Sequence, residues 1–226
     1  MTRGVLVTGG NRGIGAAIAD AFRDLGDEVV ALSSADVDLA DPTAIARVVD
    51  SAAARLGTID VLVNNAGLVE LGSFDDKSYE DWQALWRRTF DVNVFGAANM
   101  TYCVARHMVE RNVRGRIVNV GSRGAFRGEP DMPAYGASKA ALHSMGQSLA
   151  VALAPHGIAV ASVAPGFVAT DRVADMVTDD VRRQSPFGRV AKPEEVAAAV
   201  VYLASPAAEW ASGAVLDLNG ASYLRT

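Results

Sequence analysis

The sequence predicts one α/β domain built on a doubly wound parallel sheet of about seven strands, with helices on both faces. Short β-rich runs alternate with longer Ala-rich amphipathic segments, which is typical of parallel strands joined by crossover helices. The β-rich runs are apolar, as expected of strands that are buried on both faces of a sheet. The chain has 226 residues, half of them hydrophobic. This length fits a single domain spanning residues 1–226 with a large core.

The first strand is expected at Gly4–Thr8, and the helix after it, residues 14–25, ends at Gly26. Further apolar strand candidates are residues 28–33, 59–64, 116–121, 158–164 and 214–218. Further helix candidates are residues 42–56, 79–111, 134–154 and 193–204. A proline in the first turn of the first and last of these supports their starting points.

The crossover after the second strand is too short to hold a helix. Only five residues separate Leu32 from Asp38, whereas a parallel crossover with its helix needs about 10 to 12 residues. We therefore expect a bare loop there and a vestigial strand around residues 37–39. In a sheet of this kind, ligands bind beyond the carboxyl ends of the strands.

A glycine-rich turn joins the first strand to the first helix, with Gly9, Gly13 and Gly15 at the bend. Without side chains, this backbone lets its N–H groups and the positive end of the helix approach a pyrophosphate. An ordinary tight turn is the alternative. Its position directly after the first strand of a βαβ unit favours a dinucleotide site of the Rossmann type.

The end of the second strand bears on the choice of dinucleotide. Ser33 and Ser34 stand where many dinucleotide folds have an acid that holds the ribose 2′-hydroxyl of NAD. Neutral hydroxyls do not repel a 2′-phosphate, and Arg12 would give it a positive partner. These residues favour NADP(H). Asp36 lies close enough to keep NAD(H) open, and Arg12 could equally be a solvated surface charge.

Five motifs occur in a characteristic order: residues 8–15, the Asn-Asn-Ala-Gly of residues 64–67, Asn93, Ser122, and the Tyr-Gly-Ala-Ser-Lys of residues 135–139. In this order they resemble the single-domain branch of the short-chain dehydrogenases/reductases, over roughly residues 4–223. Within that family, the glycine turn and the shortened crossover are similar to those of NADPH-dependent 3-oxoacyl-[acyl-carrier-protein] reductases.

The resemblance implies hydride transfer between a nicotinamide and a ketone or secondary alcohol, with Tyr135 as general acid and base. The free pKa of tyrosine, about 10, is too high for that work at neutral pH. Lys139 follows one helical turn later on the same helix face, so we expect its ammonium to lower the pKa of Tyr135. The resemblance also implies that Lys139 holds the nicotinamide ribose, that Ser122 orients the substrate oxygen, and that Asn93 holds a proton-relaying water.

The same resemblance assigns further positions to the cofactor. Asp38 matches an acid that contacts the adenine amine, and Leu39 would lie beside the adenine ring. Asn64 is expected to brace the sheet, while the segment 165–170 matches one that holds the nicotinamide carboxamide. The cofactor-binding set is Thr8, Gly9, Asn11, Arg12, Gly13, Ile14, Gly15, Ser33, Ser34, Asp38, Leu39, Asn65, Ala66, Gly67, Tyr135, Lys139, Pro165, Gly166, Val168 and Thr170.

Composition argues against several classes of partner. The net charge is −5 and the basic residues are scattered, so no basic strip is expected to bind nucleic acid. No apolar run approaches the roughly 18 residues of a membrane span. Cys103 is the only cysteine, which indicates a cytoplasmic protein. We expect no metal site, because His107, His143 and His156 lack ligand spacing and are interpreted as surface or packing residues.

Substrate choice is expected in three loops, residues 69–74, 123–132 and a lid at 171–187. Arg123 and Arg127 would suit an anionic or carrier-linked substrate, or could simply be solvated. Trp82, Trp86 and Phe90 form a stripe typical of a core or a subunit contact. The resemblance implies a homotetramer or homodimer formed through the Ala-rich helices, with a second contact at residues 213–224.

Two other functions stay open at this point. One is an NAD-dependent dehydrogenase of a cyclic diol or sugar. The other is a nucleotide-binding regulator that kept the fold and lost catalysis. The joint presence of Ser122, Tyr135 and Lys139 favours an enzyme, although each of them alone would be an ordinary capping or surface residue.

Overall fold

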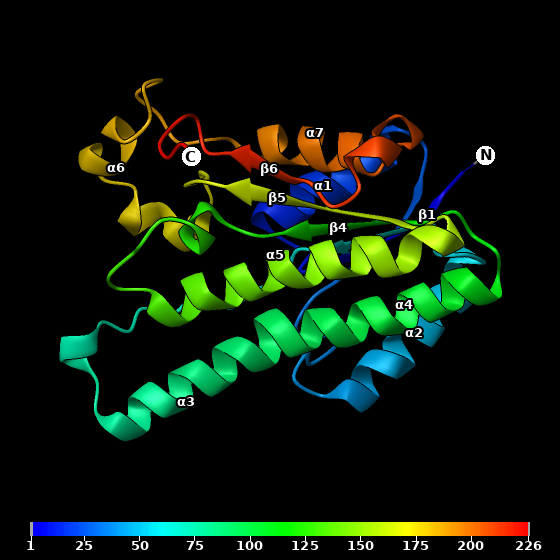
Figure 1. Ribbon diagram of the computed structural model, residues 1–226, viewed down its shortest axis with the longest axis horizontal. Helices are drawn as coiled ribbons and strands as arrows, with labels where there is room; N and C mark the ends of the chain where they lie inside the picture. Colours follow the sequence, from blue (N-terminus) through cyan, green and yellow to red (C-terminus); the bar gives the residue numbers. More distant parts are fainter. Residues whose placement is uncertain (1, 226) are drawn as a thin grey trace.

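A computed structural model describes residues 2–225 and shows a sheet of six parallel strands with helices on both faces (Figure 1). The order across the sheet is β2-β1-β3-β4-β5-β6, so the chain reverses direction across the sheet between β1 and β3. Ligands bind at such a switch point in open α/β sheets. The strands are β1 (Gly4–Thr8), β2 (Glu28–Leu32), β3 (Val61–Asn64), β4 (Arg116–Val120), β5 (Ala159–Pro165) and β6 (Val215–Leu218).

The helices lie close to their predicted bounds. Residues 42–56 begin with a proline in the first turn, and the Asp41 carboxylate accepts hydrogen bonds from the Thr43 and Ala44 N–H groups at 2.8 and 3.2 Å. The α-helices are α1 (Gly13–Asp24), α2 (Pro42–Leu56), α3 (Tyr79–Phe90), α4 (Ala97–Glu110), α5 (Pro133–Leu153), α6 (Asp179–Arg183) and α7 (Pro193–Leu203). Short 3-10 helices are η1 (Phe74–Asp76), η3 (Arg123–Ala125), η4 (Ala154–His156), η5 (Asp171–Met176) and η6 (Pro206–Ala211).

Two apolar cores lie on opposite faces of the sheet, as the apolar strands predict. Along β1, Val5 and Val7 pack with α1 and α7, whereas Leu6 packs with α2 and α4. All three side chains are fully buried, and burying each stabilises the fold by about 1.5 to 3 kcal/mol. Figure 1 shows α1 and α7 on one side of the strands and α4 and α5 on the other. The sheet is therefore fixed from both sides.

The expected strand at residues 37–39 does not form, so the prediction of about seven strands was wrong by one. The Val37 N–H donates to the Ser33 carbonyl at 3.2 Å and the Asp41 N–H donates to the Asp38 carbonyl at 3.1 Å. These local turns use backbone N–H and carbonyl groups that a strand would need for hydrogen bonds to its neighbour in the sheet. The prediction of a crossover without a helix is confirmed, because residues 33–41 contain only turns.

Residues 79–111, predicted as one helix, are interrupted by a π-helical segment, η2 (Asp91–Gly96). The two α-helices and this segment still form one continuous rod beside α5 (Figure 1). π-helical turns are frequent at functional sites, and this one carries Asn93. Within residues 2–225, none of the helices combines the length and the apolar character that crossing a membrane requires.

Candidate active site

A cleft of about 800 Å³ opens beyond the carboxyl ends of β1 to β5. Its walls are the segments that directly follow these strands, together with the start of α5 and the beginning of the lid. The cleft brings together every residue of the predicted cofactor-binding set, and Ser122 as well. These side chains come from six separate parts of the sequence and meet because all the strands end at one edge.

The glycine turn leaves the N-terminus of α1 exposed to the cleft. Gly13 has a φ of +54°, which L residues rarely adopt, and a Cβ on Gly15 would lie 2.0 Å from the Gly9 carbonyl oxygen. No side chain caps the helix at Arg12, and its first turn holds no acid. The free N–H groups and the helix dipole therefore favour an anion here. This part of the cleft fits the diphosphate of a dinucleotide.

Thr8 and Asn65 join the turns that follow β1 and β3. The Thr8 hydroxyl accepts from the N–H groups of Asn65 at 3.0 Å and Ala66 at 3.1 Å. The Asn65 amide donates to the carbonyl oxygens of Thr8 and Gly9, both at 3.0 Å. The prediction that Asn64 braces the sheet is confirmed by its bonds to Thr101 and Asn119. These contacts keep the floor of the cleft rigid.

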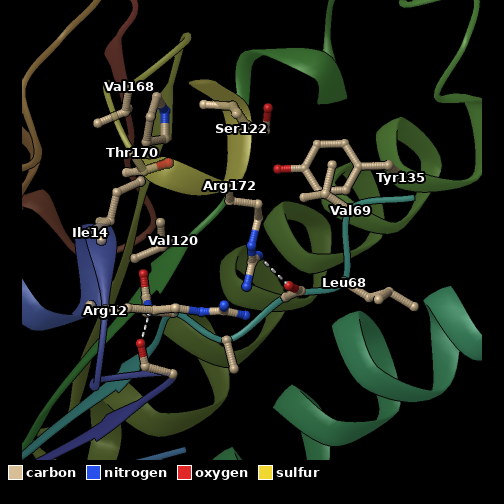
Figure 2. Close-up of a pocket in the computed structure, with 18 of the residues that line it drawn as sticks. Arg12, Ile14, Leu68, Val69, Val120, Ser122, Tyr135, Val168, Thr170 and Arg172 are labelled. Carbon is tan, nitrogen blue, oxygen red and sulfur yellow. Dashed lines mark hydrogen bonds between the residues drawn. The ribbon is translucent and has the colours of Figure 1, made fainter. Parts of the chain in front are cut away.

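Tyr135 and Ser122 face each other at the inner end of the cleft. Figure 2 shows their hydroxyl groups pointing toward one another. Ser122 directly follows Gly121 at the end of β4, and its Oγ accepts from the Gly124 N–H at 3.0 Å. Lys139 is 3% exposed, donates from Nζ to the Val120 carbonyl at 2.9 Å, and lies 5.7 Å from the centre of the Tyr135 ring. A phenol, a hydroxyl and an ammonium thus share one corner of the cleft.

The pKa of Tyr135 differs from the expectation. Burial raises this pKa, and the Ser122 hydroxyl and the Arg172 charge oppose the rise. The cation that opposes this rise is Arg172 and not Lys139, whose ammonium donates to the Val120 carbonyl oxygen. Burial lowers the pKa of Lys139 to about 8, and the Arg172 charge adds to this effect. In this structure the phenol therefore keeps its proton at neutral pH.

Asn93 lies behind the cleft wall instead of lining it. It is 1% exposed, and its Oδ1 accepts from the Leu68 N–H at 2.6 Å. Its Nδ2 donates to the Leu68 carbonyl and to the Ser138 hydroxyl, both at 3.0 Å. The hydrogen bonds described for its side chain thus involve Leu68 and Ser138, not Lys139. Asn93 holds the backbone that follows Asn-Asn-Ala-Gly in place.

The corner beside β2 contains both the expected hydroxyls and an acid. The Asp36 carboxylate accepts from the Ser33 N–H at 2.7 Å and from the Ser33 hydroxyl at 2.6 Å. The bond from the Ser33 hydroxyl, and then the bond from its N–H, lower the pKa of Asp36. A negative charge therefore lies on one of the two hydroxyls predicted to favour a 2′-phosphate. The Asp38 carboxylate caps its own turn by accepting from the Ala40 N–H at 2.9 Å.

Arg123 is buried at the edge of the cleft, so the expectation that it is solvated was wrong. It is 3% exposed, and its guanidinium donates to Ser222 at 2.5 Å, Gln184 at 2.6 Å and Glu129 at 3.3 Å. Arg127 also donates to Gln184, at 3.0 Å. The two arginines attach Gln184 of the lid to the segment that follows β4. Their sequence neighbours gave no sign of this, because the partners lie up to 99 residues away.

Arg172 is a cleft residue that sequence reasoning missed. It belongs to η5 at the start of the lid, and its Nη1 donates to the Gly67 carbonyl at 2.8 Å (Figure 2). Its only sequence signal is its place two residues after Thr170. The lid is irregular, so no periodicity indicates which of its side chains turn inward.

His107, His143 and Cys103 are held by packing and hydrogen bonds within the fold. His107 accepts from the Ile59 N–H at 3.2 Å, and the buried His143 stacks on Phe126 with ring centres 5.3 Å apart. Burial lowers the pKa of His143 to about 4 and raises the pKa of Cys103. Over residues 2–225, no three His, Cys, Asp or Glu side chains are grouped so as to hold a metal ion.

Comparisons with known proteins agree with this geometry. A family model described as enoyl-(acyl carrier protein) reductase matches residues 32–220. The chain is 34% identical to an acetoacetyl-CoA reductase of Shinella zoogloeoides, over 99% of both proteins. It is 35% identical to the 2,3-dihydro-2,3-dihydroxybenzoate dehydrogenase of Escherichia coli, over 98% of this chain and 97% of that one.

Among solved structures, the chain is similar to the 3-ketoacyl-(acyl-carrier-protein) reductase of Brucella melitensis complexed with NADH. The TM-score is 0.90 at 28% identity, and the match covers 98% of each chain.

Proposed function

This chain belongs to the short-chain dehydrogenase/reductase family, and we propose that it moves a hydride between NADP(H) and a ketone or secondary alcohol, with Tyr135 as general acid and base. Members of the family are oxidoreductases that act on CH–OH or ketone groups with NAD(P). One observation carries the proposal: Ser122, Tyr135 and Lys139 meet at the inner end of a cleft whose outer part fits a dinucleotide diphosphate.

Tyr135 is suited to donate a proton during reduction. Its hydroxyl points into the cleft beside the Ser122 hydroxyl, and its raised pKa keeps it protonated at neutral pH. A carbonyl oxygen placed between the two hydroxyls would accept a hydrogen bond from each. When bound, the nicotinamide supplies or accepts the hydride, and this chemistry belongs to the cofactor. The proton of Tyr135 then neutralises the alkoxide.

Lys139 and Asn93 are proposed to act from the floor. Lys139 lies close to Gly67, because a Cβ added to Gly67 would be 3.2 Å from the Nζ of Lys139. An ammonium there would bind the ribose hydroxyls of the cofactor and keep positive charge near the phenol. Asn93 acts through the backbone that it holds: its two bonds to Leu68 fix the wall behind the ribose site. We therefore assign Asn93 a positioning role.

The choice of cofactor is the first point to test. Ser33 and Ser34 support NADP(H), because they offer hydroxyls where many dinucleotide folds have an acid, and Arg12 adds a positive charge to the cleft. The Asp36 carboxylate on Ser33 supports NAD(H) as the second candidate, because it brings a negative charge to the same corner. Turnover with NADPH at least ten times that with NADH is the expected result. A tenfold preference for NADH would reverse the assignment.

The substrate is proposed to be a small carbonyl compound or its alcohol, either free or attached to a thioester carrier. Acyl thioesters match one relative described above, and cyclic diols match another. The test is a panel of 3-oxoacyl thioesters, simple ketones and cyclic diols, assayed with each cofactor by the absorbance of the reduced nicotinamide. No turnover of any carbonyl or alcohol while both dinucleotides bind would favour a nucleotide-binding regulator instead.

We further propose a homotetramer or a homodimer. Exposed apolar side chains lie on the rod and on α5: Phe95 is 58% exposed, Tyr102 69% and Val151 78%. Another group, Tyr202, Trp210 and Leu216, lies on α7, η6 and the edge strand β6. Burying such groups would remove apolar surface from water. Sedimentation measurements should find a mass of two or four chains, and a monomer would contradict this.

A further inference from the structure

Arg172 spans the mouth of the cleft. Its backbone belongs to η5, at the start of the lid, and its Nη1 donates to the carbonyl oxygen of Gly67, 105 residues away. The segment before it lies against the glycine turn, since a Cβ on Gly13 would be 3.1 Å from the Thr170 methyl group. The guanidinium is thereby held over the end of the cleft where α1 begins.

A second guanidinium approaches the same space. Arg12, which precedes the first turn of α1, extends across the cleft toward Arg172 (Figure 2). Burial lowers the pKa of Arg172, and the nearby charge of Arg12 lowers it further. Among residues 2–225, no carboxylate lies within salt-bridge distance of either arginine. Two converging cations without an acid between them form a site for an anion.

The position of this site indicates which anion would bind there. It lies between the uncapped N-terminus of α1 and the turn after β3, the two walls of the switch point. We propose that Arg172 binds the diphosphate of the nicotinamide dinucleotide, and that a phosphate oxygen replaces the Gly67 carbonyl as its acceptor. This inference rests on the proposed function. A planar guanidinium suits phosphate because it donates two parallel hydrogen bonds.

The exchange links cofactor binding to the lid. In this structure the Gly67 carbonyl is a neutral acceptor for a charged donor, whereas a diphosphate offers charged oxygens and stronger hydrogen bonds. Arg172 would therefore form stronger hydrogen bonds when the dinucleotide is bound than when it is not. Because Arg172 begins the lid, the same contact would draw residues 171–187 over the bound cofactor.

The test compares Arg172→Leu with Arg183→Leu. Both arginines are exposed lid residues, but Arg183 pairs with Asp180 on α6 and does not line the cleft. Dissociation constants for NADPH and NADH are measured by calorimetric titration at low and moderate salt. For Arg172→Leu we expect about tenfold weaker binding of both dinucleotides and a shallower salt dependence. Arg183→Leu should bind like the wild type, and Arg172→Lys should fall in between.

Other results would overturn the assignment. Unchanged or tighter binding by Arg172→Leu would mean that the arginine only contacts the Gly67 carbonyl and does not meet the diphosphate. A loss confined to NADPH would assign Arg172 to the 2′-phosphate instead. Unchanged dinucleotide binding with a higher KM for an acidic substrate would assign it to the substrate. If the wild type binds neither dinucleotide, the proposed function itself falls, which the wild-type titration reveals before any variant is made.

Discussion

The floor of the cleft and its lid are built in different ways. The floor consists of buried strand ends and the start of α5, where Ser122, Tyr135 and Lys139 are fixed by the sheet. The lid, residues 171–187, consists of one 3-10 helix and the five-residue helix α6, which Figure 1 shows away from the sheet. A few side chains attach it: Arg172 donates to Gly67, Gln184 accepts from two arginines, and Ser185 donates to the Gly220 carbonyl.

This difference indicates that the floor and the lid have separate roles. The floor holds the groups that are proposed to move protons, and the same sheet supports both the floor and the apolar core. The lid is joined by contacts that can break singly, so it can open and close while the floor stays intact. Changes in the floor should therefore affect folding and chemistry as well as binding, whereas changes in the lid should affect binding with little effect on folding.

The largest effect is expected from Gly15→Ala. Its Cβ would lie 2.0 Å from the Gly9 carbonyl oxygen and 2.5 Å from the Asn65 amide nitrogen, both part of the rigid floor. We expect the free energy of unfolding to fall by about 3 kcal/mol or more, with loss of dinucleotide binding. Urea denaturation measures the first effect. Gly128→Ala is the matched control, because nothing lies within 4 Å of its Cβ position; equal losses in both variants would contradict a rigid floor.

Arg123→Met should have the next largest effect, at the junction between floor and lid. It removes donors to Ser222, Gln184 and Glu129. We expect a loss of about 2 kcal/mol in the free energy of unfolding. Amide hydrogen exchange should also become faster in residues 171–187. Arg127→Met, at a half-buried site, should cost much less. If exchange in the lid stays unchanged, Arg123 does not attach it.

A smaller effect concerns pH. The pKa of Lys139 is lowered to about 8 by burial, so its ammonium is lost as the pH rises through that value. Because the charged form is the one proposed to bind the cofactor, we expect affinity for NADPH to weaken about fivefold between pH 7 and pH 9. Lys139→Met should bind more weakly at pH 7 and should lose this pH dependence. A wild-type affinity that is constant across the range would show that Lys139 does not meet the cofactor.

The smallest effect is expected at Asp36, where the group is exposed and screened by solvent. Replacing its carboxylate in Asp36→Asn removes the negative charge from Ser33. The ratio of kcat/KM for NADPH to that for NADH should rise about threefold. Asp24→Asn, at an exposed site on α1 outside the cleft, serves as control. A ratio that falls would mean that Asp36 supports binding of the 2′-phosphate.

The same division explains how much the sequence could predict. The strands, the helices and the cleft edge follow from apolar runs and glycine positions, which act locally. The missing strand at residues 37–39 depends on turn bonds that compete with ladder bonds. The π-helical segment at Asn93 changes the hydrogen-bond register without changing the residue pattern. Periodicity therefore could not reveal either of them.

The lid side of the site was the least predictable part. Arg172 and Arg123 are defined by partners about 100 residues distant, and nothing in an irregular segment indicates which way a side chain turns. The pKa of Tyr135 was also mispredicted. The helical spacing placed Lys139 on the correct face, but only the structure shows that burial outweighs the surrounding positive charge.

The central claim is that Tyr135 supplies the proton while the rest of the cleft binds the cofactor. The most direct test is a single-turnover measurement on Tyr135→Phe, loaded with NADPH and mixed with a ketone that the wild type reduces. Bound NADPH is followed by fluorescence and hydride transfer by the loss of nicotinamide absorbance. The account predicts NADPH affinity within about twofold of the wild type and hydride transfer at least about a hundredfold slower. Transfer at the wild-type rate would contradict it.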